Sequence, residues 1–420
     1  EAALLGHRAL VLDWCDLDDT LLLERDPRTL ALDLLHECAP LCREFGVPVY
    51  LLSHHPLKLL RLHASHAEPI STTYPPAPQR ATLWSVHLRR AAIAPPESPE
   101  LRRLAHTFVF CEDDIARVVR HAERLLRTRS VPVGIADLEE ICRDDLDVRL
   151  QGLTRRVRSS ARLEDLVLSD EQRGGIEELI AYARYRDTLF EDWGFGAHYA
   201  SGKGVHCLFT GPPGTGKTLA ASIVANALEL PLYRIELSQI VDRYVGETEK
   251  RLEQVFDEAS RCPCALLFDE ADSLFGKRTE VRSSNDRYAN IEVNYLLQRM
   301  EDFEGVTLLT TNLETSLDQA FLRRIRFCVR FPEPDRALAT QLWRKLLPAE
   351  VEREGHIDFE HLATRFEMTG GHIKNAVLRA ALNAMRERRG LSHQDLEQAA
   401  LVEYSKLGKL ATGSAPKPRT

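Results

Sequence analysis

Hydrophobic and polar positions follow two different periods along the chain, and the change of period divides it. Between about residues 163 and 331, short apolar runs of strand length alternate with segments of helical spacing. Such alternation predicts a parallel sheet whose strands are buried on both faces, and therefore an α/β domain. The predicted strands are Val205–Thr210, Leu232–Glu236, Ala265–Asp269, Thr307–Thr311 and Cys328–Phe331.

A different pattern begins after residue 334. From 337 to 401, apolar residues recur three or four positions apart, for example at Ile373, Val377 and Ala380. This spacing is typical of amphipathic helices. We therefore predict an α/β subdomain over 151–335, a helical subdomain over 336–408 and a short, polar, disordered tail over 409–420.

Residues 1–150 repeat landmarks of the later segments at offsets of 256 to 259 residues. Ala9–Asp13 matches Ala265–Asp269, and Trp84 matches Trp343. Further landmarks at 104–105, 114–115 and 137–139 have counterparts at 362–363, 372–373 and 395–397. We interpret residues 1–150 as a partial, degenerate copy of the same module. Shared helical composition alone is the alternative.

The most specific motif lies between the first predicted strand of the sheet and a helical segment, Leu219–Leu228. Residues 211–218, Gly-Pro-Pro-Gly-Thr-Gly-Lys-Thr, fit the G-x-x-x-x-G-K-[ST] pattern of a phosphate-binding loop, or P-loop. Its glycines let backbone N–H groups surround a phosphate, and the helix N-terminus adds partial positive charge. The motif predicts that Lys217 reaches the β- and γ-phosphates and that Thr218 ligates Mg²⁺. We predict that ATP or GTP binds through Pro213, Gly214, Thr215, Gly216, Lys217, Thr218 and Leu219; a plain glycine-rich turn is the alternative.

Two carboxylates follow the third predicted strand. Four apolar residues precede Asp269 and Glu270, and Asp269 lies 52 residues after Lys217. A buried strand of this kind delivers both acids to the sheet edge beside the P-loop. We predict that Asp269 holds Mg²⁺ through its water shell and that Glu270 activates the attacking water as a general base. The pattern therefore predicts hydrolysis as well as binding.

Polar residues also follow the fourth predicted strand. Asn312 is predicted to contact the γ-phosphate or the attacking water, and a cap of the following helix or turn is the alternative. Arg323, Arg324 and Arg326 either form a solvated basic face or include arginine fingers. A finger stabilises the charge that develops on the transferred phosphoryl group.

Together these motifs resemble those of the AAA ATPases, in the branch that remodels proteins, over roughly residues 163–400. The resemblance implies ATP as the nucleotide and Asn312 as the sensor residue. It implies that Arg323 and Arg326 are fingers for the ATP of a neighbouring subunit, although the family's Pro-Gly between them is Arg-Ile here. It also implies that Gly370 and Gly371 begin a lid helix over the adenine. Fingers that act on a neighbour imply a homo-oligomer, most often a hexamer in this family.

The resemblance extends to loops that contact substrate. Tyr244, Val245 and Gly246 are similar to the family's central pore loop, where an aromatic ring grips an unfolded polypeptide. A turn with a packed tyrosine is the alternative. Residues 275–287 fit a second pore loop. These features imply a protein substrate or particle component as partner.

A narrower resemblance concerns the ATPases encoded with bacterial extracellular contractile injection systems. It is based on the first copy, which has no P-loop in residues 1–150 and has Trp14 where the second copy has Glu270. It is also based on the segments 271–277 and 286–300. This resemblance implies a role in the assembly or maturation of such a particle.

Composition sets limits on these predictions. The 420 residues carry 63 acidic and 55 basic side chains, a net charge of −8, which disfavours broad nucleic-acid or membrane-surface binding. No apolar run approaches the roughly 18 residues of a membrane span, and no signal peptide opens the chain. Nine dispersed cysteines, an odd number, predict a reducing bacterial cytoplasm. The chain begins at Glu1 rather than Met, which predicts a fragment or a processed product.

Two alternatives to a protein-remodelling ATPase stay open at this point. One is a DNA-acting switch of AAA type, which the acidic charge balance and the loop at Tyr244 disfavour. The other is a scaffold that holds ATP with little turnover, which the intact pair Asp269 and Glu270 disfavours.

Overall fold

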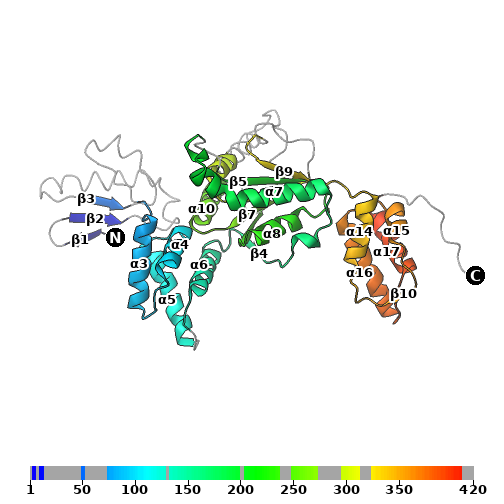
Figure 1. The fold of residues 1–420 in the computed structure, drawn as a ribbon, viewed down its shortest axis with the longest axis horizontal. Helices are drawn as coiled ribbons and strands as arrows, with labels where there is room; N and C mark the ends of the chain where they lie inside the picture. The colour runs from blue at the N-terminus through cyan, green and yellow to red at the C-terminus, as the bar shows by residue number, and fades with distance from the viewer. Residues whose placement is uncertain are drawn as a thin grey trace, which may run out of the picture. The chain divides into compact units, whose positions relative to one another are not determined.

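The structure is a computed structural model that describes residues 73–128, 132–198, 203–236, 247–272, 295–312 and 323–408, together with the backbone of three strands between residues 2 and 52. The chain forms two compact units, Glu1–Thr73 and Tyr74–Thr420. In the first unit, β1 (Ala2–Leu5) pairs antiparallel with β2 (Ala9–Asp13), and β2 pairs in parallel with β3 (Val49–Leu52) (Figure 1).

The second unit is built around a six-stranded sheet with the order β4-β6-β7-β8-β5-β9. All neighbouring strands pair in parallel except β4 and β6, which are antiparallel. The predicted α/β fold class is confirmed. The bounds are β4 Arg155–Val157, β5 Val205–Thr210, β6 Leu232–Glu236, β7 Ala265–Asp269, β8 Val306–Thr311 and β9 Phe327–Arg330.

The strands agree with the predicted runs to within one residue. β5, β6 and β7 have the predicted bounds, β8 begins one residue earlier, and β9 is shifted one residue toward the N-terminus. Every position of β5, β7 and β8 is buried, which agrees with the largely apolar sequences of these strands. The sequence pattern does not predict β4, because this short edge strand has the sequence Arg-Arg-Val.

Helices cover both faces of the sheet (Figure 1). On one face, α7 (Asp170–Asp187) and α8 (Lys217–Ala227) form a core with Phe209. On the other, α10 (Glu247–Arg261) and a helical segment over 295–302 form a core with Phe268. The inner strands β5, β7 and β8 are therefore buried on both faces, whereas the edge strands β4 and β9 keep exposed positions.

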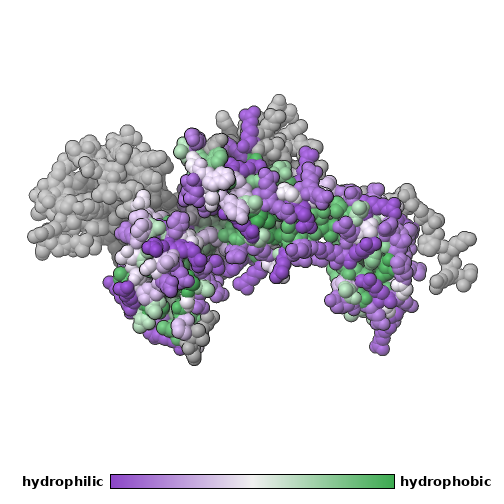
Figure 2. Space-filling model, in the orientation of Figure 1, coloured by the Kyte–Doolittle hydropathy of each residue, from purple (hydrophilic) through white to green (hydrophobic). Residues whose placement is uncertain are grey.

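The predicted helical subdomain contains four helices with their own core around Trp343. The helices are α14 (Arg336–Leu346), α15 (Phe359–Arg365), α16 (Gly370–Arg386) and α17 (His393–Lys406), with the short strands β10 (Arg353–Glu354) and β11 (Leu391–Ser392). We call this segment the lid. On the face in view, Figure 2 shows a largely hydrophilic surface over the described residues, with hydrophobic patches on the lid and over the part of the chain that contains the six-stranded sheet.

Four more helices precede the sheet within the second unit. They are α3 (Ala77–Arg90), α4 (Ser98–Thr107), α5 (Glu112–Thr128) and α6 (Ile135–Arg149), and we call them the first bundle. The first bundle packs on β6 and α10: the backbone N–H of Val109 donates to the carbonyl oxygen of Arg261 at 2.8 Å, and Arg149 pairs with Glu258 at 3.2 Å. Across the described residues, no helix combines the length and apolarity needed to cross a bilayer.

Candidate nucleotide-binding site

The P-loop connects β5 to α8, as its motif requires. Gly214 has a φ of 77° and Gly216, which caps α8, has a φ of 104°. These values lie in the left-handed region, which glycine adopts without the steric penalty that a Cβ would impose. The loop therefore turns its backbone tightly at the carboxyl end of a central strand, where open α/β sheets bind ligands.

Lys217 is buried and lies inside the loop that it terminates. Its ammonium group donates to the carbonyl oxygens of Gly211 at 2.6 Å and Pro212 at 2.8 Å. It also donates to Oδ1 of Asn312 at 2.9 Å. Two residues predicted independently, one from the P-loop and one from the end of β8, are thus in direct contact.

Asp269 ends β7 and is buried beside the start of α8. Thr218 donates its hydroxyl to Oδ1 of Asp269 at 3.1 Å. The structure thus brings together the two predicted Mg²⁺ residues. A hydroxyl and a carboxylate are oxygen donors, the type that Mg²⁺ prefers while keeping several waters. The donor set therefore fits the predicted ion.

Two further residues hold Asp269, and the sequence analysis missed both. Thr310 on β8 donates its hydroxyl to Oδ1 of Asp269 at 2.5 Å. Nε of Arg234 on β6 lies 3.1 Å from Oδ2 of Asp269 and forms an ion pair with it. Each lies on a strand that carries other polar residues, so no local sequence signal distinguishes either contact.

Glu270 lies just beyond the strand end in an unusual backbone conformation. Its φ is 55°, in the left-handed region, where a non-glycine residue costs of order 1–3 kcal/mol. Its backbone N–H donates to the hydroxyl oxygen of Thr310 at 3.0 Å, and its side chain is exposed. The hydroxyl of Thr310 therefore contacts both neighbouring acids. It donates to the side chain of Asp269 and accepts from the backbone N–H of Glu270.

The start of the lid helix α16 touches the P-loop. The backbone N–H of Gly371 donates to the carbonyl oxygen of Gly214 at 2.8 Å. A Cβ added to Gly371 would lie 3.1 Å from the Cα of Gly214, which is tighter than ordinary packing. Of the two predicted lid glycines, Gly371 thus allows the close approach of two backbones beside the predicted phosphate site, and Gly370 precedes it.

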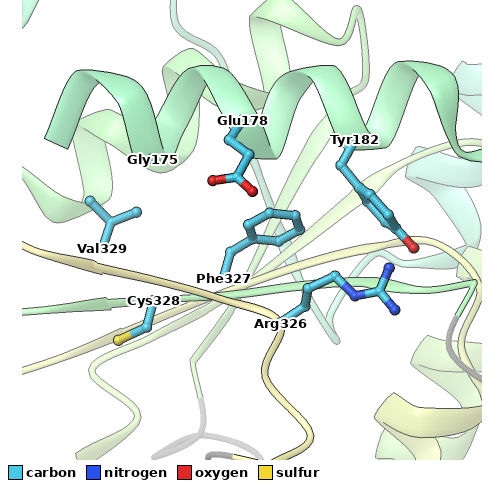
Figure 3. Close-up of a pocket in the computed structure, with 7 residues that line it drawn as sticks. All are labelled: Gly175, Glu178, Tyr182, Arg326, Phe327, Cys328 and Val329. Atoms are coloured by element: carbon cyan, nitrogen blue, oxygen red, sulfur yellow. The ribbon is translucent and has the colours of Figure 1, made fainter. Parts of the chain in front are cut away.

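The three arginines have different surroundings. The guanidinium of Arg326 lies 4.4 Å from the ring centroid of Tyr182 and borders a cavity of about 320 Å³ between α7 and β9 (Figure 3). Burial lowers the pKa of Arg326 from its usual value. Arg324 pairs with Glu301 at 2.5 Å, and Arg323 is exposed. Neither described contact connects an arginine to the P-loop of its own chain.

Several predicted residues lie outside the described residues. They are the pore-loop residues Tyr244, Val245 and Gly246, and the second predicted loop at 275–287. Their predicted roles stay predictions.

The sheet order, the P-loop and the paired acids define a P-loop nucleoside triphosphatase. Within that class, residues 207–333 match the family described as "ATPase family associated with various cellular activities (AAA)". This segment of the chain is therefore similar to the AAA ATPases, in agreement with the resemblance predicted from the motifs.

Three relatives illustrate the similarity. The chain is 36% identical over 231 residues to an "ATP-dependent zinc metalloprotease YME1 homolog" of Caenorhabditis elegans, covering 53% of this chain and 30% of that protein. It is 31% identical over 250 residues to a "26S proteasome regulatory subunit 8 homolog" of Encephalitozoon cuniculi, covering 57% and 62%. It is 30% identical over 248 residues to the "ATP-dependent zinc metalloprotease FtsH" of Lancefieldella parvula, covering 57% and 37%. The chain thus spans less than two thirds of each relative.

Proposed function

We propose that this chain hydrolyses ATP within a homo-oligomer and uses the energy to remodel a protein partner. One observation carries the proposal: residues of the P-loop form side-chain hydrogen bonds with residues at the ends of β7 and β8, at one end of the sheet. Lys217 contacts Asn312, and Thr218 contacts Asp269. Glu270 follows Asp269 directly, so a general base lies next to the two groups proposed to hold Mg²⁺.

Each residue then has a distinct role. When ATP is bound, Lys217 would exchange its carbonyl partners for the β- and γ-phosphate oxygens, and Thr218 and Asp269 would hold Mg²⁺, which would offset the charge of the phosphates. Glu270 takes a proton from the attacking water. The N-terminus of α16 has no acidic residue in its first turn, so Gly370 and Gly371 approach a bound nucleotide without repelling its phosphates.

The lid supports self-association. Leu378, Leu382 and Met385 lie on one face of α16 and are 59%, 59% and 75% exposed. In the first bundle, the positions 258 residues earlier are all arginine: Arg120, Arg124 and Arg127. An apolar stripe on only one of two similar helices favours a partner for that helix. We assign this partner to a second copy of the chain, because the arginines proposed as fingers also require one.

A protein substrate is supported by the relatives' names, which describe proteasome regulatory subunits and ATP-dependent metalloproteases.

We predict that Tyr244→Ala keeps its basal ATPase rate but loses remodelling of its protein partner, because an aromatic ring that grips a polypeptide makes no contact with ATP. Unfolding of a tagged candidate partner, measured beside phosphate release, checks this. Equal remodelling by the variant and the wild type would contradict the proposed pore loop.

A role in assembly of a contractile injection particle is part of the proposal and is based on the sequence resemblance alone.

We also propose that residues 1–150 are a degenerate copy of the ATPase module. The strands β2 and β3 pair in parallel, as β7 and β8 do. Leu10 lies opposite Val49 in the first pair, and Leu266, at the matching position, lies opposite Thr307 in the second. The helices α3 to α6 match α14 to α17 in order and in buried positions, and four matched pairs are completely buried: Trp84 with Trp343, Ile115 with Ile373, Ala122 with Ala380, and Leu138 with Leu396.

The degenerate copy lacks the features that would receive a nucleotide. At the start of α5, Glu112 and Asp113 occupy the positions of Gly370 and Gly371, and two carboxylates there would repel phosphate. We therefore predict that each chain binds one ATP. Calorimetric titration with a non-hydrolysable analogue measures the number of sites. Two sites per chain would contradict the degenerate copy.

Phosphate release with and without duplex DNA tests the proposed function against its main rival. The proposal predicts turnover that duplex DNA leaves unchanged. Stimulation by DNA would favour a DNA-acting switch instead, and binding of ATP without turnover would favour a scaffold.

A further inference from the structure

Two histidines and a glutamate meet where α15 and α17 lie side by side in the lid (Figure 1). His361 belongs to α15, whereas His393 and Glu397 lie four positions apart on one face of α17. Each residue has a potential ligand atom within 4.8 Å of those of the other two. His361 is exposed, and the other two side chains are partly buried. Neither the P-loop nor the paired acids give these three residues a role.

The spacing of the two imidazole rings fits a shared metal ion. Nδ1 of His361 lies 3.3 Å from Nε2 of His393. Histidine nitrogens lie about 2.0–2.1 Å from Zn²⁺, so two of them on one tetrahedral ion are roughly 3.3–3.4 Å apart. Hydrogen bonds from N–H groups mostly span about 2.7–3.2 Å, so a direct bond between the rings would be a long one. The two nitrogens therefore already have the separation that one bound ion requires.

Glu397 can bind the same ion while it keeps its ion pair. Nη1 of Arg365 donates to Oε1 of Glu397. An ionised carboxylate has a second oxygen with its own lone pairs, and this oxygen is available to a metal. Imidazole nitrogen and carboxylate oxygen both suit Zn²⁺ and similar divalent transition metals. The three side chains therefore form a donor set of a common kind.

Metal binding requires one proton of His393 to move. The backbone N–H of Asp358 lies 3.3 Å from Nδ1 of His393, so without a metal Nδ1 accepts and Nε2 carries the ring proton. A metal at Nε2 places that proton on Nδ1 instead. The contact given up is a long hydrogen bond, so its loss is a small cost. Metal-bound imidazoles usually donate the second N–H to a carboxylate or carbonyl, and Asp358 itself carries a carboxylate.

The first bundle provides an internal comparison. At the positions 258 residues earlier, α4 and α6 carry Arg103, Ile135 and Glu139. Arg103 pairs with Glu139 at 3.3 Å. In the first bundle, a guanidinium thus joins the two matching helices through this glutamate. In the lid, two imidazoles replace the arginine and the isoleucine, which favours a bound cation in place of a cationic side chain.

We propose that His361, His393 and Glu397 bind one divalent transition metal ion of the Zn²⁺ type, which joins α15 to α17 and stabilises the lid. The ligands come from two helices and do not form the H-E-x-x-H pattern of a zinc peptidase, so we assign a structural role to the ion. No residue of the nucleotide site belongs to this set, so the inference does not depend on ATP hydrolysis.

Titration of the full chain with Zn²⁺ tests the inference. Excess Mg²⁺ is present and nucleotide is absent, because Mg²⁺ occupies oxygen ligands without competing for imidazole. We expect one Zn²⁺ per chain with micromolar or tighter affinity. His361→Gln and His393→Gln should each weaken binding by about 100-fold or more, since even loss of a supporting partner costs about 10- to 100-fold. His121→Gln changes an exposed histidine of α5 and should bind Zn²⁺ as the wild type does.

A double variant separates loss of the site from loss of the fold. His361→Arg with His393→Ile gives the lid the residues that the first bundle carries at the matching positions. We expect this protein to fold and to bind no Zn²⁺. Zn²⁺ should raise the melting temperature of the wild type and leave that of the double variant unchanged.

Two results would overturn the inference. One is a wild-type chain that binds no Zn²⁺. The other is a double variant that binds Zn²⁺ as tightly as the wild type. Because all nine cysteines are unchanged in these variants, Zn²⁺ held by thiolates would give the second result.

Discussion

Glu270→Gln is expected to lower kcat by about 10²- to 10⁴-fold, the usual contribution of a general base, while ATP affinity stays near the wild-type value. The amide has the shape of the carboxylate but cannot take a proton from water. It also tolerates the left-handed backbone at this position about as well as glutamate does, so the fold should be unaffected. Phosphate release under saturating ATP measures the loss, and calorimetry measures the retained affinity.

A matched control separates this effect from the loss of one negative charge. Glu140 is an exposed residue of α6, far in sequence from the P-loop and the paired acids. Glu140→Gln makes the same chemical change and should leave kcat unchanged. If Glu270→Gln hydrolyses ATP at the wild-type rate, Glu270 is not the general base.

Arg323→Ala is expected to lower kcat by about 10³-fold or more, in the range found for arginine fingers. All three arginines are exposed, but Arg324 pairs with Glu301 and Arg326 stacks on Tyr182, whereas Arg323 forms no such contact with the part of the chain that the structure describes. Arg324→Ala is the matched control, because it removes the same side chain from the adjacent position and should cost only the weak energy of a surface ion pair.

Mixing two inactive variants tests whether Arg323 acts on a neighbour. Arg323→Ala keeps its own base but lacks its finger, and Glu270→Gln keeps its finger but lacks its base. In a random mixed assembly with head-to-tail interfaces, roughly a quarter of the sites combine an intact base with a neighbour's intact finger. We expect the mixture to recover activity on that order. If it stays as inactive as the separate proteins, Arg323 does not act in trans.

Local sequence patterns predict those elements and residues for which function or burial leaves a continuous signal along the chain. The strands β5, β6 and β7 have the predicted bounds because most of their positions are buried and apolar. The P-loop residues are recognisable because one short loop must supply glycines, a lysine and a hydroxyl in fixed order. Lys217 and Asn312, which lie far apart in the sequence, meet because parallel strands end at the same edge of the sheet.

The residues that hold the site could not be found in this way. Thr310 acts through contacts between the ends of β7 and β8, across about 40 positions of sequence. Its hydroxyl has no local spacing that distinguishes it from ordinary polar residues at strand ends. Arg234 likewise meets Asp269 only because β6 and β7 are neighbours in the sheet. Choosing among the three arginines also required their surroundings, because all three lie within four positions of sequence.

We propose that the chain is an ATPase and that an arginine of a neighbouring copy completes its ATP site. The most direct measurement follows ATP hydrolysis per chain as protein concentration rises, with the mass of the particle determined beside it in a non-hydrolysable ATP analogue. The account predicts that specific activity rises steeply with concentration and that the analogue drives formation of an oligomer. A monomer with the same specific activity at every concentration would contradict it.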